Sequence, residues 1–362
     1  MSNKRQWYQT FYTYIWVFNT GRGLSVCIRL PHNVGIIYDL GCSDDFSPTK
    51  FITDYIAPRL TPYEQCKIAQ CIMSHPHADH IWEVESILEC DNKRPPIYPH
   101  LVTCPNDKIE KEKVDFSRIE SEDNKKLIAA YRKSYEKRKP PLQTIQTKVP
   151  CNVPNVEYGF YYMPAPQVSK IYEEDNRLYG NGLSIVLYLR HGYQSILIPG
   201  DITPEVLKSI LEEDKPIEKR YTYFSNPPKN VNIPDDLHER TSTQPKLKEL
   251  LRERGLSVLL TPHHGLESCY SPELFECIKD NKPIINVISE KRHLSETDGQ
   301  IASKYQSEEG AIGLEVDIDG KKEQRYSVST RNGHHILIVF QGTNRLPRIY
   351  LRKKPEDLLE IV

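Results

Sequence analysis

The sequence predicts an α/β protein built from layers of strands and helices. Short apolar runs rich in β-branched and aromatic residues recur along the chain, separated by residues that favour turns. Amphipathic helical patterns follow several of these runs, and this alternation is typical of sheets covered by helices. Nearly every run leads into a polar loop that carries chemically active side chains. We therefore expect the functional site at the ends of the strands.

Three β-rich runs open the chain, at residues 14–18, 24–30 and 34–38, with turn-forming breaks at 19–23 and 31–33. Runs this short, joined by such turns, predict a β-meander. Further strands are predicted at residues 70–73, 184–190, 195–198, 257–260, 284–288 and 336–340.

The helices are predicted from their start signals and apolar spacing. Thr203, Pro204 and Glu205 form an N-cap, a first-turn proline and a first-turn acid. Residues 246–254 repeat the apolar spacing and end at Gly255, a typical C-terminal cap. A further helical pattern covers residues 80–88.

We predict a single domain over residues 1–345, with insertions at about 104–145 and 213–244 and a C-terminal tail at 346–362. The first insertion is rich in charge and has apolar residues at helical spacing, which suggests a cap over the main body. Its basic half includes Arg132 and Lys133, candidate substrate contacts, although such a run is more often a solvated helix face. The second insertion is polar and rich in proline, as in a surface loop or lid.

The composition is that of an ordinary globular protein, with 38% hydrophobic and 27% charged residues. The 48 Lys and Arg nearly cancel the 49 Asp and Glu, so binding of nucleic acid requires a local basic patch. The nine cysteines form no CxxC pair, which indicates free thiols in a reducing compartment. No segment resembles a signal peptide or a membrane span. We expect a cytoplasmic protein with no membrane partner, and the oligomeric state stays open.

The candidate active site is centred on the loop Ser74-His75-Pro76-His77-Ala78-Asp79-His80. A predicted strand precedes this loop and a predicted helix follows it, the position at which α/β proteins place active sites. Its four ligand-type side chains are two imidazoles two residues apart, a carboxylate and a third imidazole: His75, His77, Asp79 and His80. Imidazole and carboxylate without thiolate indicate a catalytic site for zinc, manganese or iron. A His-rich surface loop is the structural alternative.

Two other loops offer remote ligands and weaken that alternative. Asp201 follows the apolar run 196–198 and a Pro-Gly turn, and His263 and His264 follow the run 259–260. Alone, such residues are more often a capping aspartate or packed histidines. Three ligand loops at strand ends in one chain predict a metal centre, in which Asp201 reaches one ion or bridges two.

This order of motifs resembles the metallo-β-lactamase superfamily over residues 14–340, and within it the hydrolase domain of the ComEC-type DNA-uptake proteins. The resemblance implies a four-layer αββα sandwich, here with two insertions. The supporting segments are 21–23, 36–41, 74–80, 184–187, 199–201, 263–265 and 271–273.

Carried over to this sequence, the resemblance implies one divalent metal ion on His75 and His77. It implies a second on Asp79, His80 and a histidine of the His-His-Gly motif, with Asp201 between the two. We favour His263 as that ligand because it lies nearer the strand end, which leaves His264 and Asp79 as candidates for moving protons or holding phosphate. Asp39 is expected to support the loop of the first two histidines, or to be an ordinary turn residue.

The chain also departs from the pattern. Lactamases and glyoxalases have a further histidine in the region matching residues 163–184, and none occurs here. Asn181, Ser184 or a water molecule could complete the first ligand set. Leu183, Leu266 and Cys269 replace polar residues of the ComEC-type family, so we expect altered substrate contacts and no role in DNA import.

These observations predict a phosphodiester hydrolase that uses one or two zinc or manganese ions to activate water. A nuclease acting on DNA or RNA is the first hypothesis, with the basic segment near Arg132 guiding the backbone. The alternative is a hydrolase of a small phosphodiester or ester, such as a cyclic nucleotide, phosphocholine or a lactone. A degenerate binding or regulatory module is the third.

Overall fold

The structure is a computed structural model that describes residues 11–21, 23–62, 67–90, 97–105, 114–119, 153, 155–212, 245–290 and 299–362. Most of the first predicted insertion, all of the second, and the candidate contacts Arg132 and Lys133 lie outside these residues.

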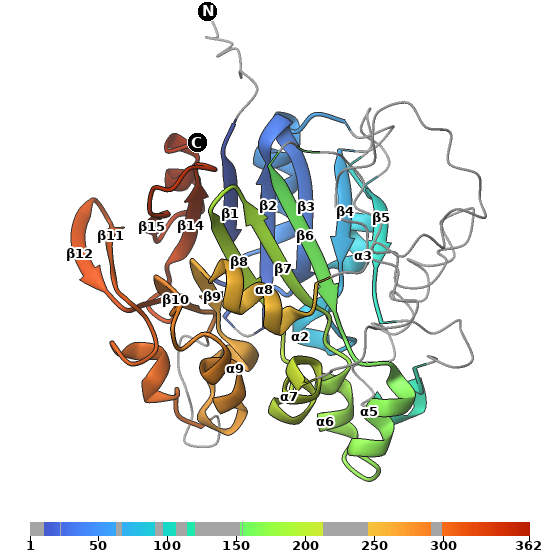
Figure 1. Ribbon diagram of the computed structural model, residues 1–362. Helices are drawn as coiled ribbons and strands as arrows, with labels where there is room; N and C mark the ends of the chain where they lie inside the picture. Colours follow the sequence, from blue (N-terminus) through green and yellow to red (C-terminus); the bar gives the residue numbers. More distant parts are fainter. Residues whose placement is uncertain are drawn as a thin grey trace, which may run out of the picture.

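Two mixed sheets form the centre of the fold (Figure 1). The larger has the order β12-β11-β15-β14-β1-β2-β3-β4-β5 and the smaller β13-β10-β9-β8-β7-β6. The strands of the larger sheet are β1 Thr13–Val17, β2 Ser25–Leu30, β3 Val34–Leu40, β4 Ile68–Ile72, β5 Pro99–Thr103, β11 Leu314–Ile318, β12 Lys321–Arg325, β14 His335–Phe340 and β15 Arg348–Arg352. Those of the smaller sheet are β6 Val156–Tyr161, β7 Val186–His191, β8 Gln194–Ile198, β9 Val258–Leu260, β10 Ile285–Ile288 and β13 Ser327–Ser329.

Helices cover the outer faces of the sheets. They are α1 Pro48–Phe51, α2 Ala78–Ile81, α3 Val84–Leu88, α5 Ala165–Ile171, α6 Asn176–Gly182, α7 Pro204–Glu212, α8 Leu247–Arg254 and α9 Pro272–Cys277. In Figure 1, α2, α5, α6, α7 and α9 gather at one end of the two sheets.

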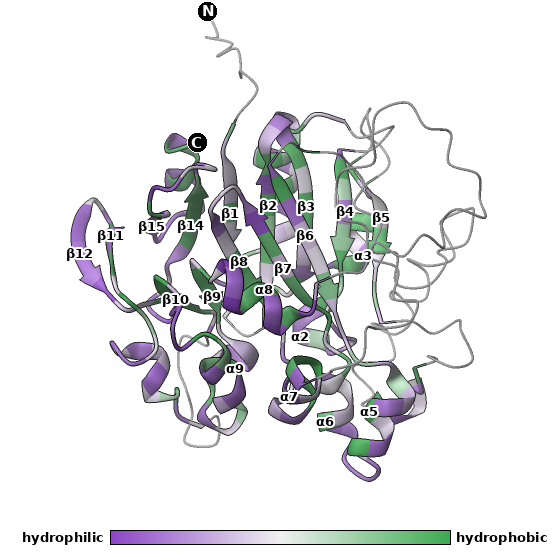
Figure 2. Cartoon of the chain, viewed as in Figure 1, coloured by the Kyte–Doolittle hydropathy of each residue, from purple (hydrophilic) through white to green (hydrophobic). Residues whose placement is uncertain are grey.

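Side chains that alternate along each strand explain the layers. Ile15 and Val17 of β1 lie in an apolar cluster made almost wholly of strand residues from both sheets, which places it between them. Trp16, between them in sequence, belongs to the second cluster, which includes residues of the flanking helices. Hydrophobic colour accordingly runs through both sheets in Figure 2. The predicted α/β class, with its two sheets and covering helices, is confirmed.

The nine predicted strands are all present, with ends shifted by a few residues, and the opening meander is β1, β2 and β3. The helices at Pro204 and at residues 246–254 are confirmed as α7 and α8. The helix predicted over residues 80–88 is instead broken into α2 and α3. The break lies at Glu83, whose backbone N–H donates to the carbonyl of Leu40 and whose carboxylate accepts from the N–H of Thr49. These tertiary contacts replace helical hydrogen bonds.

The C-terminal segment differs from the expected tail. β15 lies inside the larger sheet, antiparallel to β14 and parallel to β11. Ile349 and Leu351 are buried and alternate with more exposed residues, which is the pattern of a strand with one face on the core. The arginines at both ends of this strand conceal that pattern in the sequence.

No helix in the described part of the chain combines the length and apolar character that a membrane crossing requires.

Candidate metal centre

The ligand loops meet because parallel strands end at the same edge of each sheet. β3 and β4 are parallel neighbours, and so are β8, β9 and β10. Asp39 lies at the end of β3 and the 74–80 loop follows β4, whereas Asp201 follows β8 and the two adjacent histidines follow β9. Backbone hydrogen bonds join the loops across the sheets, from Ile185 N–H to the Ser74 carbonyl and from His263 N–H to the Gly200 carbonyl. All three predicted ligand loops therefore converge.

Asp39 supports the loop, as one of the two sequence interpretations expects. It is fully buried and has a left-handed backbone, with φ of 56°. Its carboxylate accepts three hydrogen bonds of 2.7 Å, from Ser74 N–H, from the Ser74 hydroxyl and from Nδ1–H of His80. Such partners fix both the orientation and the tautomer of a metal-binding imidazole.

Three histidines use Nδ1 for a hydrogen bond within the protein. The hydroxyl proton of Ser74 goes to Asp39, so Ser74 Oγ accepts from Nδ1–H of His75 at 2.9 Å. The carbonyl of Ser289 can only accept, so Nδ1 of His264 donates to it at 2.7 Å. His75 and His264 therefore leave Nε2 as a lone pair that is buried without a hydrogen-bond partner, whereas Nε2 of His80 is buried and faces Oδ1 of Asp201 at 3.2 Å. This is the arrangement that a metal ion requires of imidazole ligands.

His263 is held differently. Its Nδ1 lies 3.0 Å from the sulfur of Cys269 and 3.4 Å from the amide nitrogen of Asn181. Burial raises the pKa of Cys269 to about 11, so the thiol stays protonated at neutral pH, and both neighbours can donate. In the tautomer in which Nδ1 accepts from these donors, the ring proton is on Nε2, which faces Oδ2 of Asp201 at 3.7 Å. In that tautomer the ring presents an N–H, not a lone pair, to the centre.

Two groups of described side chains bring ligand atoms within 4.8 Å of one another. One is His75, His80 and Asp201, and the other is Asp79, His80 and His264. His77 is in neither group, although its ring centroid is 4.7 Å from that of His75. Of the predicted ligands, His75, Asp79, His80 and Asp201 are thus brought together, with His264 where His263 was expected.

Charge explains why this cluster suits a cation. Burial opposes protonation of His80, but the carboxylates of Asp201 and Asp39 outweigh it and raise the pKa of His80 well above its usual value. Burial also opposes ionisation of Asp201, but the neighbouring histidines, His80 foremost, hold its pKa well below the usual value. His80 Nε2 lies 3.2 Å from Oδ1 of Asp201. The buried carboxylates thus hold positive charge at this position, and a divalent cation can replace the proton.

Two predicted polar contacts also face the interior. Asn181 Oδ1 and the Ser184 hydroxyl are both buried and lack a hydrogen-bond partner. The amide of Asn181 reaches His263, so α6 borders the centre.

Two glycines leave room for the backbone of Asp79 to pack closely against them. A Cβ on Gly23, whose φ is 90°, would lie 1.8 Å from the Asp79 carbonyl oxygen, and a Cβ on Gly41 would lie 2.2 Å from it. Leu24 N–H donates to the same oxygen at 3.3 Å. Neither this contact nor Ser289 is predicted from the sequence, although the Gly-x-Gly spacing at residues 21–23 is a signal for a close backbone approach.

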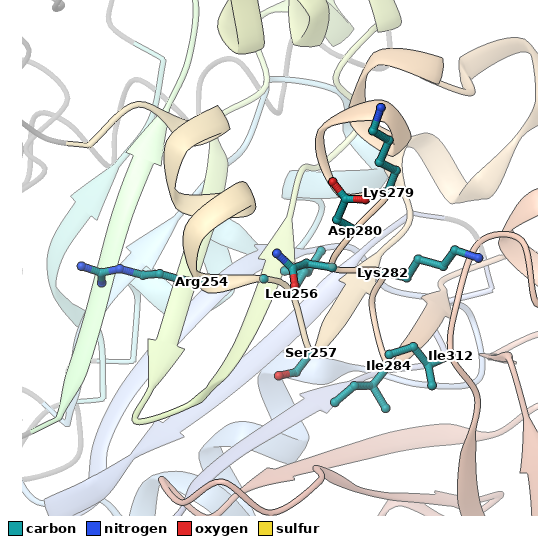
Figure 3. A pocket seen from close by; sticks show the side chains of 10 residues that line it. Arg254, Leu256, Ser257, Lys279, Asp280, Lys282, Ile284 and Ile312 are labelled. Atoms are coloured by element: carbon teal, nitrogen blue, oxygen red, sulfur yellow. The ribbon is translucent and has the colours of Figure 1, made fainter.

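A pocket of about 400 Å³ lies elsewhere, near Arg254, Lys279 and Lys282 (Figure 3). It adjoins Ser257 and Ile284, which precede β9 and β10, whereas the candidate metal centre lies beyond the opposite ends of these strands. Its cations are engaged: Arg254 with Glu157, Lys279 with Glu276, and Lys282 with the carbonyl of Glu308. It is not part of the candidate site.

Comparison with solved structures finds distant likenesses. One is the metallo-beta-lactamase fold protein YhfI from Bacillus subtilis, with 13% identity and a TM-score of 0.32 over 76% of this chain and 95% of that chain. Another is a mutant of CmlA beta-hydroxylase, with 11% identity and a TM-score of 0.33 over 77% and 52%. No family model and no curated protein matches.

The structure itself shows an α/β fold of two mixed sheets with a buried His/Asp cluster at its strand ends, and this cluster could hold a metal ion.

Proposed function

We propose that the protein is a metal-dependent phosphodiester hydrolase, with DNA or RNA as its first candidate substrate. Metal dependence is supported by three imidazoles around Asp201, each with Nδ1 anchored and Nε2 buried. Nε2 of His75 and of His264 has no hydrogen-bond partner, and Nε2 of His80 faces the Asp201 carboxylate. A merely structural histidine cluster would satisfy these nitrogens.

We infer that one ion is held tightly. The two candidate ligand groups share His80, whose single Nε2 can bind one ion only. The ligands are then two carboxylates and three imidazoles: Asp79, Asp201, His75, His80 and His264. Zinc and manganese both suit this donor set.

We further infer that His264 and His263 exchange the roles expected from the sequence. His264 offers a lone pair beside Asp79 and His80, whereas His263 offers an N–H. When bound, the ion supplies Lewis acidity and lowers the pKa of a water molecule to about 7. His263 Nε2–H is suited to donate to a negatively charged oxygen of the substrate, and Cys269 and Asn181 keep it in that tautomer.

Phosphodiester substrates are favoured over lactams and thioesters for two reasons. The histidine that lactamases and glyoxalases have in the region of residues 163–184 is absent. An N–H donor beside a cation also complements the charge of a phosphate better than a neutral carbonyl.

The proposal is tested by metal analysis and a digestion panel. We expect about one equivalent of zinc or manganese per chain, and cleavage of single- or double-stranded DNA or of RNA. His80→Ala and Asp201→Asn should lose both the bound metal and the cleavage activity, because each substitution removes a proposed metal ligand. Asp280→Asn changes an exposed carboxylate at the pocket end of β10 and is the matched control.

Intact nucleic acids, together with cleavage of bis(p-nitrophenyl) phosphate, would reject the nuclease and keep a small phosphodiester as substrate. A protein that binds no transition metal and is unaffected by both ligand substitutions would contradict the hydrolase and favour a binding module.

A further inference from the structure

Helix α6 lies directly against the candidate metal centre. Its Gly180 packs so closely on His77 that an added Cβ would lie 2.2 Å from Nε2 of that ring. The next residue, Asn181, reaches Nδ1 of His263. Two consecutive residues of α6 therefore contact two of the ligand loops.

Arg177 lies one helical turn before Asn181, and residues four apart share a helix face. Its side chain is exposed and forms no hydrogen bond or ion pair within the described part of the chain. Its guanidinium, which has no partner there, thus lies on the face of α6 that carries Asn181, at the border of the candidate site.

Arg118, from the short helical segment Phe116–Ile119, is an arginine with a structural role beside the same helix. Its guanidinium lies over the ring of Tyr179 at 4.2 Å and donates to Asn176 Oδ1 at 3.1 Å and to Ser169 Oγ at 2.8 Å. Arg118 is committed to holding α6 in place. Arg177 makes no comparable contact within the described residues.

We propose that Arg177 binds the negatively charged phosphate of the substrate and makes the site select anionic phosphodiesters over neutral esters. Guanidinium groups bind phosphate oxygens in pairs through two parallel N–H donors, which an ammonium group cannot reproduce. His263 Nε2–H and Arg177 then approach the phosphate from neighbouring elements. The selectivity rests on the proposed phosphodiester activity, whereas anion binding by Arg177 does not.

The first experiment measures binding of inorganic phosphate by calorimetry, with and without added zinc. Arg177→Gln should weaken binding at least about tenfold in the metal-loaded protein, since a charge-assisted hydrogen bond is lost. Arg177→Lys should retain only part of the wild-type affinity for phosphate. The matched control is Arg252→Ala, which removes an exposed arginine of α8 near the amino end of β9. Phosphate affinity equal to wild type in Arg177→Gln would overturn the proposal.

The second experiment separates this proposal from the proposed function. For bis(p-nitrophenyl) phosphate, Arg177→Gln should raise KM at least about tenfold with a smaller change in kcat, and leave hydrolysis of neutral p-nitrophenyl acetate unchanged. Equal losses on both esters would refute selectivity for anions. A wild type that cleaves no phosphodiester, while Arg177→Gln still loses phosphate binding, would reject the function but support Arg177 as the anion-binding residue.

Discussion

Replacing Asp39 with asparagine should invert the tautomer of His80 without changing the shape of the site. The amide oxygen of Asn can still accept from Ser74 N–H. Its NH₂ group takes the place of Oδ2. In the wild-type protein, Oδ2 accepts hydrogen bonds from both the Ser74 hydroxyl and Nδ1–H of His80. To avoid two facing donors, His80 must accept at Nδ1 and move its proton to Nε2, the nitrogen that points to the centre.

The size of the effect follows from the lost contacts. Asp39 is 0% exposed, so no solvent compensates for a mismatched donor. Loss of the partner that orients a metal ligand costs about 10- to 100-fold in metal affinity. This corresponds to about 1.4–2.7 kcal/mol. Asp39→Asn should therefore raise the Kd for zinc by this factor.

The assay is competition for zinc with a chromophoric chelator at pH 7.5, accompanied by thermal unfolding of the metal-free protein. Asp175→Asn is the control, because Asp175 caps α6 and asparagine is an equally good cap. Zinc affinity within twofold of wild type, in a folded Asp39→Asn protein, would refute the tautomer argument.

Three other predictions address the fold. Gly23→Ala should cost about 2–3 kcal/mol in the free energy of unfolding and weaken metal binding, because its Cβ meets the Asp79 carbonyl. Gly320→Ala, at a similar φ of 85° with nothing within 4 Å, isolates the strain from the clash, and equal effects would disprove the clash. Burial lowers the pKa of His335 to about 4, so the unfolded chain takes up a proton below about pH 6.5 that the folded chain does not. This group should therefore lower the free energy of unfolding by up to about 3 kcal/mol between pH 6.5 and pH 4. In urea unfolding, His335→Asn should make the free energy of unfolding depend less steeply on pH, and an unchanged pH dependence would contradict the prediction. Deleting residues 346–362 removes four buried aliphatic side chains, about 6–12 kcal/mol, and should prevent folding, whereas a soluble product with a cooperative melt would argue against it.

The parts of the fold that could be predicted from the sequence are those in which apolar runs lie between turn residues. β1 to β3 and β8 to β10 are buried along their whole length, so apolar residues predominate in each of them. β12 has no buried residue and consists of charged residues and one Gln, because it is an edge strand paired with β11 alone. Its hydrophilic colour in Figure 2 shows why apolar patterning does not detect it.

The convergence of the ligand loops could also be predicted, because it depends on strand ends and parallel pairing. The roles of individual imidazoles could not, because they depend on which atom lies at Nδ1. For His264 that atom is the carbonyl of Ser289 and for His263 the thiol of Cys269, and no spacing in the sequence encodes either contact.

The backbone of the His-His-Gly turn bears on which of its two histidines faces the candidate metal centre. His263 and His264 are consecutive left-handed residues, with φ of 45° and 60°, and Gly265 follows at 76°. Such a turn is neither strand nor helix, so the side chain nearer the strand need not be the one aimed at the metal centre. Non-glycine residues adopt this conformation at a cost of about 1–3 kcal/mol each, which the surrounding contacts must offset. Contacts from Nδ1 of His264 to the Ser289 carbonyl and from Nδ1 of His263 to the Cys269 sulfur hold the two rings in place. In our proposal the strained turn thereby places the lone pair of His264 and the N–H of His263 side by side at Asp201.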